Sequence, residues 1–203
     1  HPYTLSEKGG PIEREEDGVF GSCLNIQEGQ WLRADRESVP ALNISGSDAQ
    51  VTVIAWVKRA LKSNNECEFV AGLWNESNAK RQYGMFLNLS IWDSAQQVCG
   101  HVSSIGGPTP GFRWCMDSSI GATSVPFGEW QCIGFTYDGN FAKSYLNGKL
   151  DTRPERNPYP YPGGIFDGGK DGADFTVAAV DRAGTIGNFF VGRLGGLAVF
   201  RGA

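Results

Sequence analysis

The 203-residue sequence lacks the features that several large classes of protein require. No run of about eighteen apolar residues is present, so no segment is a candidate membrane span, and the sequence does not open on a charged-then-apolar leader. No window keeps apolar residues at the spacing of an amphipathic helix. The formal net charge is −4, and the 18 basic residues are interspersed with 22 acidic ones. We therefore expect no nucleic-acid partner, because phosphate binding needs clustered Lys and Arg.

Catalytic motifs are scarce as well. The sequence has two histidines, His1 and His101, and neither has a second histidine at metal-ligand spacing or a G-x-S-x-G nucleophile turn to serve. The string E-x-D-x-x-E, which would provide paired carboxylates for glycoside hydrolysis, is absent. A non-catalytic protein is the expectation. The alternative is an unorthodox active site that uses His101, Tyr159 and Arg113.

Glycine is abundant, and short alternating runs of apolar residues lie between the glycines. The sequence contains 28 Gly and 10 Pro, which is typical of many turns between short strands. In the segment 130–150, Ile133, Phe135 and Tyr137 alternate with small residues, which is the period of a strand. The second run of this segment closes on Asn147-Gly148, a dipeptide that favours a tight hairpin turn. The length suits one β-sandwich domain.

The segment 130–150 reads WQCIGFTYDGNFAKSYLNGKL and resembles the laminin-G-like modules of the concanavalin A-like lectin and glucanase superfamily. In those modules a strand of the form W-x-x-hydrophobic-x-hydrophobic-T-Y-D-G precedes a strand that ends Y-x-N-G. Segments 19–32, 51–57 and 190–200 are similar to further strands of the same modules. The resemblance implies an all-β fold, a two-sheet antiparallel β-sandwich of the concanavalin A-like jelly-roll type. It implies a domain over 19–203, with 1–18 as an N-terminal extension or edge segment.

The strand period also predicts which side chains form the core. The predicted core residues are Val53, Trp56, Ile133, Phe135, Tyr137 and Leu197. The resemblance implies that Trp130 is a core residue too.

Two of the five cysteines flank a segment rich in Gly and Pro. Cys99 and Cys115 are symmetric about Gly107, so a long hairpin with its tip at 103–111 would place them opposite each other on neighbouring strands. The sequence allows two alternatives for this pair, a disulfide or two free thiols. An odd number of cysteines leaves at least one unpaired.

The segment 167–174, DGGKDGAD, is the candidate metal site. Asp167, Asp171 and Asp174 offer the oxygen ligands that Ca²⁺ prefers; the alternative is a turn built from Asp and Gly, which tolerate positive φ. No cofactor is required in this interpretation, and Ca²⁺ is the candidate ion. The resemblance implies structural calcium in many relatives, but Gly195 and Gly196 stand where the family often has acidic residues.

Aromatic residues in loops are the candidates for a ligand site. A flat, rigid ring suits the C–H face of a sugar, and nearby polar groups can bond its hydroxyls. The candidate aromatic residues are Trp92, Trp114, Tyr159 and Tyr161, and their candidate polar neighbours are Asp93, Arg113 and Asn157. Prolines interleave the two tyrosines and disfavour sheet pairing, so we expect both tyrosines to be exposed.

The resemblance then implies a function. It points to a non-catalytic carbohydrate-binding or accessory module of a larger secreted multidomain protein, from which this chain would be excised or processed. The expected location is secreted or periplasmic, and the expected partner is a glycan or polysaccharide, or a neighbouring domain of the parent protein. The alternatives are a polysaccharide lyase or glycoside hydrolase of the same fold, and a structural domain that binds protein.

Overall fold

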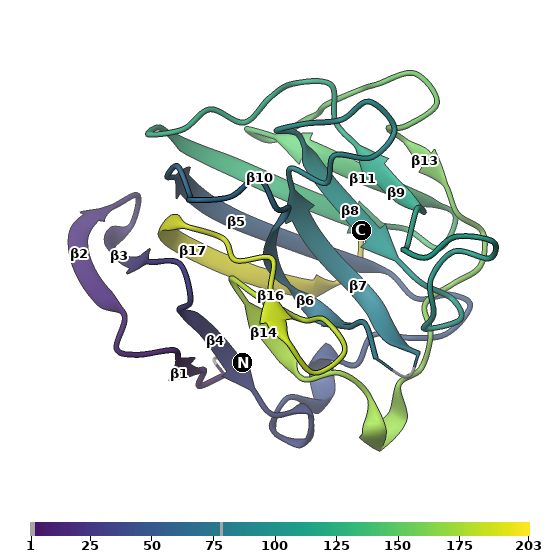
Figure 1. Ribbon diagram of the computed structural model, residues 1–203. Helices are drawn as coiled ribbons and strands as arrows, with labels where there is room; N and C mark the ends of the chain where they lie inside the picture. Colours follow the sequence, from purple (N-terminus) through teal and green to yellow (C-terminus); the bar gives the residue numbers. More distant parts are fainter. Residues whose placement is uncertain (1–2, 78) are drawn as a thin grey trace.

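The computed structural model describes residues 3–77 and 79–203, which form two β-sheets packed face to face (Figure 1). The predicted antiparallel two-sheet sandwich is therefore confirmed. Helix in the described residues is limited to the short 3-10 turns η1 (Arg36–Ser38), η2 (Pro40–Leu42) and η3 (Gly169–Asp171). None of these turns is long and apolar enough to cross a membrane.

The first sheet, sheet A, takes strands from both ends and the middle of the chain. In spatial order its strands are β1 (Ser6–Lys8), β4 (Trp31–Ala34), β14 (Phe175–Val177), β6 (Glu68–Asn75), β7 (Lys80–Leu87), β8 (Val98–Val102) and β9 (Ser118–Ile120). The short strand β15 (Val180–Asp181) joins the end of β6 in parallel and pairs with β16 (Ile186–Gly187).

The second sheet, sheet B, contains the strands that the sequence pattern predicts most clearly. In spatial order they are β12 (Lys149–Leu150), β11 (Phe141–Leu146), β10 (Trp130–Tyr137), β5 (Val51–Arg59), β17 (Gly192–Arg201), β3 (Gly21–Ile26) and β2 (Glu13–Gly18), and β13 (Tyr159–Pro160) pairs with β11. The predicted turn at Asn147 and Gly148 joins β11 to β12 with positive φ at both residues. Within residues 1–18, β1 and β2 form one edge strand of each sheet.

The core lies between the sheets and follows the strand period. Val53, Ile133, Phe135 and Tyr137 are fully buried, as predicted. Leu197 also packs against the core, but it is only partly buried. Alternate residues of β5 and β10 therefore face inward, and the residues between them lie on the outer face of sheet B.

The prediction that Trp56 and Trp130 are core residues is wrong. Both are half-buried on the outer face of sheet B, because each is an odd number of positions from the inward residues of its own strand. Trp130 Nε1 donates to the carbonyl of Asp17 at 3.0 Å, and the ring of Trp56 meets Phe20 edge-on. A Cβ at Gly195 would lie 2.9 Å from the Trp130 ring, so a larger residue there would displace this ring.

A buried arginine links the two sheets where the chain crosses between them. Arg59 ends β5 in sheet B, Glu68 begins β6 in sheet A, and Arg59 Nη2 lies 2.6 Å from Glu68 Oε1 with both side chains buried. The guanidinium also donates to the Val125 carbonyl and to Gln96, and it stacks on the Phe127 ring. Every charge in this network therefore has partners, as a buried ion pair requires.

Replacing Glu68 with Ala would leave the Arg59 charge buried without its carboxylate. We expect the free energy of unfolding to fall by about 3–5 kcal/mol, measured by urea denaturation. Arg14→Ala, which breaks an exposed ion pair with Glu7, is the control and should cost less than about 1 kcal/mol. Equal losses in the two variants would contradict the structural role of the buried pair.

Candidate functional site: a pocket on the outer face of sheet A

Sheet A is covered on its outer face as well as on its core face. Strands β6, β7 and β8 are buried along almost their whole length. A strand with one face in solvent would instead alternate between buried and exposed residues. Their outward side chains form a second apolar cluster under the loops that follow the strands. The buried members of this cluster are Phe69, Trp74, Phe86, Cys99, Cys115, Ile120 and Val180.

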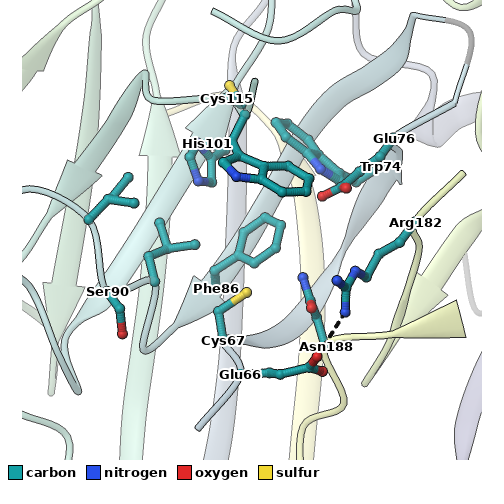
Figure 2. Close-up of a pocket in the computed structure, with 13 residues that line it drawn as sticks. Glu66, Cys67, Trp74, Glu76, Phe86, Ser90, His101, Cys115, Arg182 and Asn188 are labelled. Carbon is teal, nitrogen blue, oxygen red and sulfur yellow. Dashed lines mark hydrogen bonds and ion pairs between the residues drawn. The ribbon is translucent and has the colours of Figure 1, made fainter. Parts of the chain in front are cut away.

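A pocket of about 400 Å³ opens over this cluster (Figure 2). Its floor comes from β6, β7 and β8, and its walls come from the loops before β6, after β7, before β9 and around β16. The lining residues are Glu66, Cys67, Trp74, Glu76, Phe86, Leu89, Ser90, Ile91, His101, Trp114, Cys115, Arg182 and Asn188. A volume of this size lies at the lower end of the range for small-molecule sites.

Three aromatic rings form the floor. Trp74, Phe86 and His101 stand on neighbouring strands, and their ring centroids are 5.1–5.7 Å apart. Each is about 2–3% exposed, so their positions are fixed by packing. The floor is therefore apolar and rigid, with Phe86 edge-on to the other two rings and one imidazole in it.

His101 has a defined tautomer. Its Nδ1 lies 2.8 Å from the carbonyl oxygen of Asp117, which can only accept, so Nδ1 carries the proton. Nε2 is then an acceptor, and no hydrogen-bond partner for it is found among residues 3–77 and 79–203. Burial lowers the pKa of His101 from 6.5 to about 4. The ring is therefore neutral at physiological pH.

This pKa predicts a pH dependence of stability. The unfolded chain takes up the proton below about pH 6.5 and the folded chain only near pH 4, so the stability contribution of His101 is complete above pH 6.5 and is lost as the pH falls toward 4. We expect His101→Gln, which keeps a donor but does not titrate, to flatten the decline in Tm between pH 6.5 and 4. Parallel curves for the variant and the parent protein would show that His101 does not cause this decline.

The charged groups of the pocket lie on one wall. Arg182 Nη1 is 3.0 Å from Glu66 Oε1, and burial raises the pKa of the nearby Glu76 carboxyl. Figure 2 shows Glu76, Arg182 and Asn188 on the side of the pocket away from Ser90. The Asn188 side chain is buried and makes no hydrogen bond to the described residues. This wall thus combines an ion pair, a carboxyl group and an amide.

The thiols in and under the pocket are not nucleophiles. Burial raises the pKa of Cys67, Cys99 and Cys115 to about 12, so each stays protonated at neutral pH. All three are free thiols.

The prediction that Cys99 and Cys115 face each other is wrong. Cys99 in β8 pairs with Ile120 of β9, and Cys115 lies in the loop before β9 with its Sγ 3.9 Å from the Val102 carbonyl. The physical reason is that the segment between them is not a symmetric hairpin tip. Thr109 Oγ1 accepts hydrogen bonds from the backbone N–H groups of Met116 and of the next residue, which folds this part into its own irregular loop.

Two of the predicted aromatic residues lie on the loops at the pocket. Trp114 lines the pocket, is 43% exposed, and has the guanidinium of Arg113 at 4.7 Å from its ring centroid. Trp92 is also exposed, but Arg156 stacks on its ring at 4.3 Å and its Nε1 donates to the Met116 carbonyl. Trp92 therefore holds loops together.

The neighbours of Trp92 support the same role. Trp92 meets Phe112 edge-on, and the carbonyls of Trp92 and Asp93 both accept hydrogen bonds from Arg153. The Asp93 side chain is exposed beside them.

The other predicted ligand residues lie outside this pocket. Asn157 is buried, and its amide bonds the backbone of Ser144 in β11. The expectation that Tyr159 and Tyr161 are exposed is wrong, because both are half-buried. Tyr159 joins β13 despite its flanking prolines, since a two-residue edge strand needs few backbone donors. The tyrosine hydroxyls bond Asp117 and Ser104, outside the pocket.

The pocket floor is the part that the sequence interpretation missed. Phe86 was not predicted as a site residue, Trp74 was expected to be a loop aromatic and was not a final candidate, and His101 was considered only for catalysis. The available signal was the absence of polar alternation in β6 and β7, EFVAGLWN and KRQYGMFL, which indicates strands covered on both faces. Such a pattern reveals a covered face but not that the cover leaves a pocket.

The segment 167–174 encloses an arginine side chain. Arg36 is buried and donates to the carbonyls of Gly169 and Ala173, and a Cβ at Gly172 would lie 2.6 Å from its guanidinium carbon. Glycines here thus make room for a cation that the chain itself supplies.

The three carboxylates of this segment have different partners. Asp167 accepts from Asn43, Asp174 pairs with Arg33, and Asp171 is exposed. No group of three His, Cys, Asp or Glu side chains suited to a metal occurs in the described part of the chain. The segment therefore lacks the converging carboxylates on which the calcium prediction depended.

Arg36→Met should remove the cation and the hydrogen bonds that it donates to the carbonyls of Gly169 and Ala173. We expect the free energy of unfolding to fall by about 3 kcal/mol, measured by urea denaturation. The control Arg33→Met loses a partly exposed ion pair and should cost about 1 kcal/mol or less. Scanning fluorimetry with Ca²⁺ and with a chelator should give the same Tm for each protein, and a rise with Ca²⁺ would reveal a calcium site.

Comparison with known families identifies the superfamily. The sequence model described as "Concanavalin A-like lectin/glucanases superfamily" matches residues 33–203. The chain therefore belongs to this superfamily, as its residues indicated. No curated protein sequence matches the chain.

Solved structures share the fold at low sequence identity. Domain 4 of AbnA, a GH43 extracellular arabinanase from Geobacillus stearothermophilus in complex with arabinotriose, has a TM-score of 0.62 and 20% identity over 98% of this chain and 82% of that chain. The CBM40 of Ruminococcus gnavus IT-sialidase bound to α2,3-sialyllactose has a TM-score of 0.60 and 14% identity, over 88% and 89% of the two chains. The receptor-binding domain of botulinum neurotoxin type G has a TM-score of 0.54 and 11% identity, over 98% and 43%.

Proposed function

We propose that this protein is a non-catalytic carbohydrate-binding module and that its site is the pocket on the outer face of sheet A. The observation that carries the proposal is the combination of a rigid aromatic floor with polar groups that lack partners in the described structure. Trp74 and Phe86 form the base of the pocket, and the more exposed Trp114, Leu89 and Ile91 offer apolar surface to the C–H groups of a sugar. His101 Nε2 and the Asn188 amide are available to its hydroxyls.

Trp114 completes this arrangement at the mouth of the pocket. Its ring is partly exposed before any ligand binds, and a side chain with two rotatable bonds loses little entropy when a sugar stacks on it. The Arg113 guanidinium near the ring adds hydrogen-bond donors at the rim. Trp114 is thus the residue on which we expect binding to depend most.

Two structural neighbours support a carbohydrate ligand. The arabinanase domain was solved with arabinotriose and the CBM40 with α2,3-sialyllactose. Their likeness to this chain is one of fold, so it raises the expectation of a glycan without naming one. The arabinanase is described as extracellular, and by analogy we propose a secreted or periplasmic location and a parent protein with other domains.

The chemistry of the pocket favours binding over catalysis. Its thiols are protonated, and Glu66 is engaged by Arg182. Hydrolysis of a glycosidic bond needs one carboxyl to donate a proton while a second acts as base or nucleophile, and the pairing of Glu66 leaves Glu76 alone for such roles.

Trp114→Ala should weaken glycan binding. We expect the affinity for the best ligand from a glycan array to fall by roughly tenfold, about 1.4 kcal/mol, measured by isothermal titration calorimetry. Phe20→Ala is the control, because Phe20 is 73% exposed and packs over sheet B.

Two outcomes would contradict the proposal. Binding that is equally weakened by both variants, or by neither, would place the site elsewhere. Release of reducing ends from the bound glycan, abolished by His101→Ala, would show an enzyme.

A further inference from the structure

We propose that the pocket selects an uncharged sugar residue over an acidic one. This inference rests on the proposed function and names its ligand class. It follows from the polar groups that line the pocket and from the way in which the charges are paired.

Two polar groups that line the pocket are open to it and have no hydrogen-bond partner in the described structure. His101 and Asn188 are 3% and 7% exposed, and both line the pocket. Among the described residues, neither His101 Nε2 nor the Asn188 amide has a hydrogen-bond partner. An imidazole nitrogen that only accepts, beside an amide that both donates and accepts, matches hydroxyl groups, which do both. Satisfying these polar groups in this way contributes affinity and discriminates against ligands without hydroxyls.

The charged groups of the pocket also favour a neutral ligand. Glu66, Glu76 and Arg182 are the ionisable side chains on the charged wall, so acidic groups outnumber basic ones there. Arg182 is already paired with Glu66 at 3.0 Å. The Arg182 and Glu66 side chains are 35% and 45% exposed, so solvent screens this pair. A ligand carboxylate would also lie against Glu76, whose pKa burial raises, and like charges in such a place repel.

Three cations lie near the pocket without lining it. Arg81 is buried, its guanidinium carbon is 6.0 Å from the Trp74 ring centroid, and its charge acts on Glu76, which balances it. Lys62 donates to the carbonyls of Cys67 and Phe189. Arg113 is exposed and stacks on Trp114 at the rim, where solvent and salt screen its charge. An uncharged sugar residue therefore fits the interior better than an acidic one.

The test compares sugars that differ in charge. Calorimetry would measure binding of galactose and galacturonic acid, glucose and glucuronic acid, and lactose and 3′-sialyllactose, with arabinotriose as a further neutral probe. A glycan array with neutral and acidic members would extend the comparison. For the pair that contains the tightest ligand, we expect the neutral member to bind about tenfold more tightly than the acidic one.

Two variants link this preference to the pocket. Asn188→Gly removes the amide and keeps a residue that accepts the positive φ of this position, and it should lower neutral-sugar affinity about fivefold. Asn147→Gly makes the same change at another positive φ, in the β11–β12 turn, and should not. Glu66→Gln frees Arg182 and should raise the ratio of acidic to neutral affinity about tenfold.

The results separate this inference from the proposed function. Tight binding of an acidic sugar that Asn188→Gly weakens would overturn the neutral preference and leave the glycan-binding pocket standing. A neutral preference that Asn188→Gly and Glu66→Gln do not alter would place selection outside this pocket and overturn the inference. No binding to any sugar would overturn both.

Discussion

The arrangement of the site depends on the hydrogen bonds and the ion pair that the buried Arg59 guanidinium makes. Through Glu68 it fixes the crossover between the sheets, and through Gln96 it reaches the loop after β7. Gln96 donates to Asn88, and Asn88 donates to the carbonyl of Glu66 on the pocket wall. A charge between the sheets is thereby connected to the rim of a pocket on the outside of one of them, and each of these bonds is costly to leave unmade.

The pocket exists because sheet A has apolar side chains on both faces. A sandwich needs one apolar face per sheet, so the aromatic floor of Trp74 and Phe86 exceeds what the core requires. Loops cover most of this second face and leave Trp114 exposed at its opening. The outer face of sheet B differs. Trp56 and Trp130 there contact the β2–β3 hairpin, and the pocket beside Tyr145 on this face, about 210 Å³, is smaller.

Strand alternation was enough to predict the sandwich and most of its core, because a period of two residues is a local property of the chain. Alternation alone would also have placed Trp130 correctly, because it is three positions from Ile133 in β10 and so faces the opposite side of the sheet. The resemblance assigned this residue to the core against its own strand pattern. The site was only partly predictable: Trp114 could be identified from its loop, but the floor joins three strands whose register is fixed by tertiary pairing. The position of Cys115 was unpredictable for a related reason, since Thr109 closes an irregular loop through side-chain bonds.

The segment 167–174 has a composition that is typical of a metal-binding loop, but here it binds a guanidinium. Its carbonyls surround Arg36, a group attached to the same chain. A bound metal ion is governed by its concentration in the medium and can be removed by a competitor. A tethered guanidinium has no free form, and its charge persists at every pH at which the protein folds. The contacts between this loop and Arg36 are therefore made once, when the chain folds, and they draw on no ion from the medium.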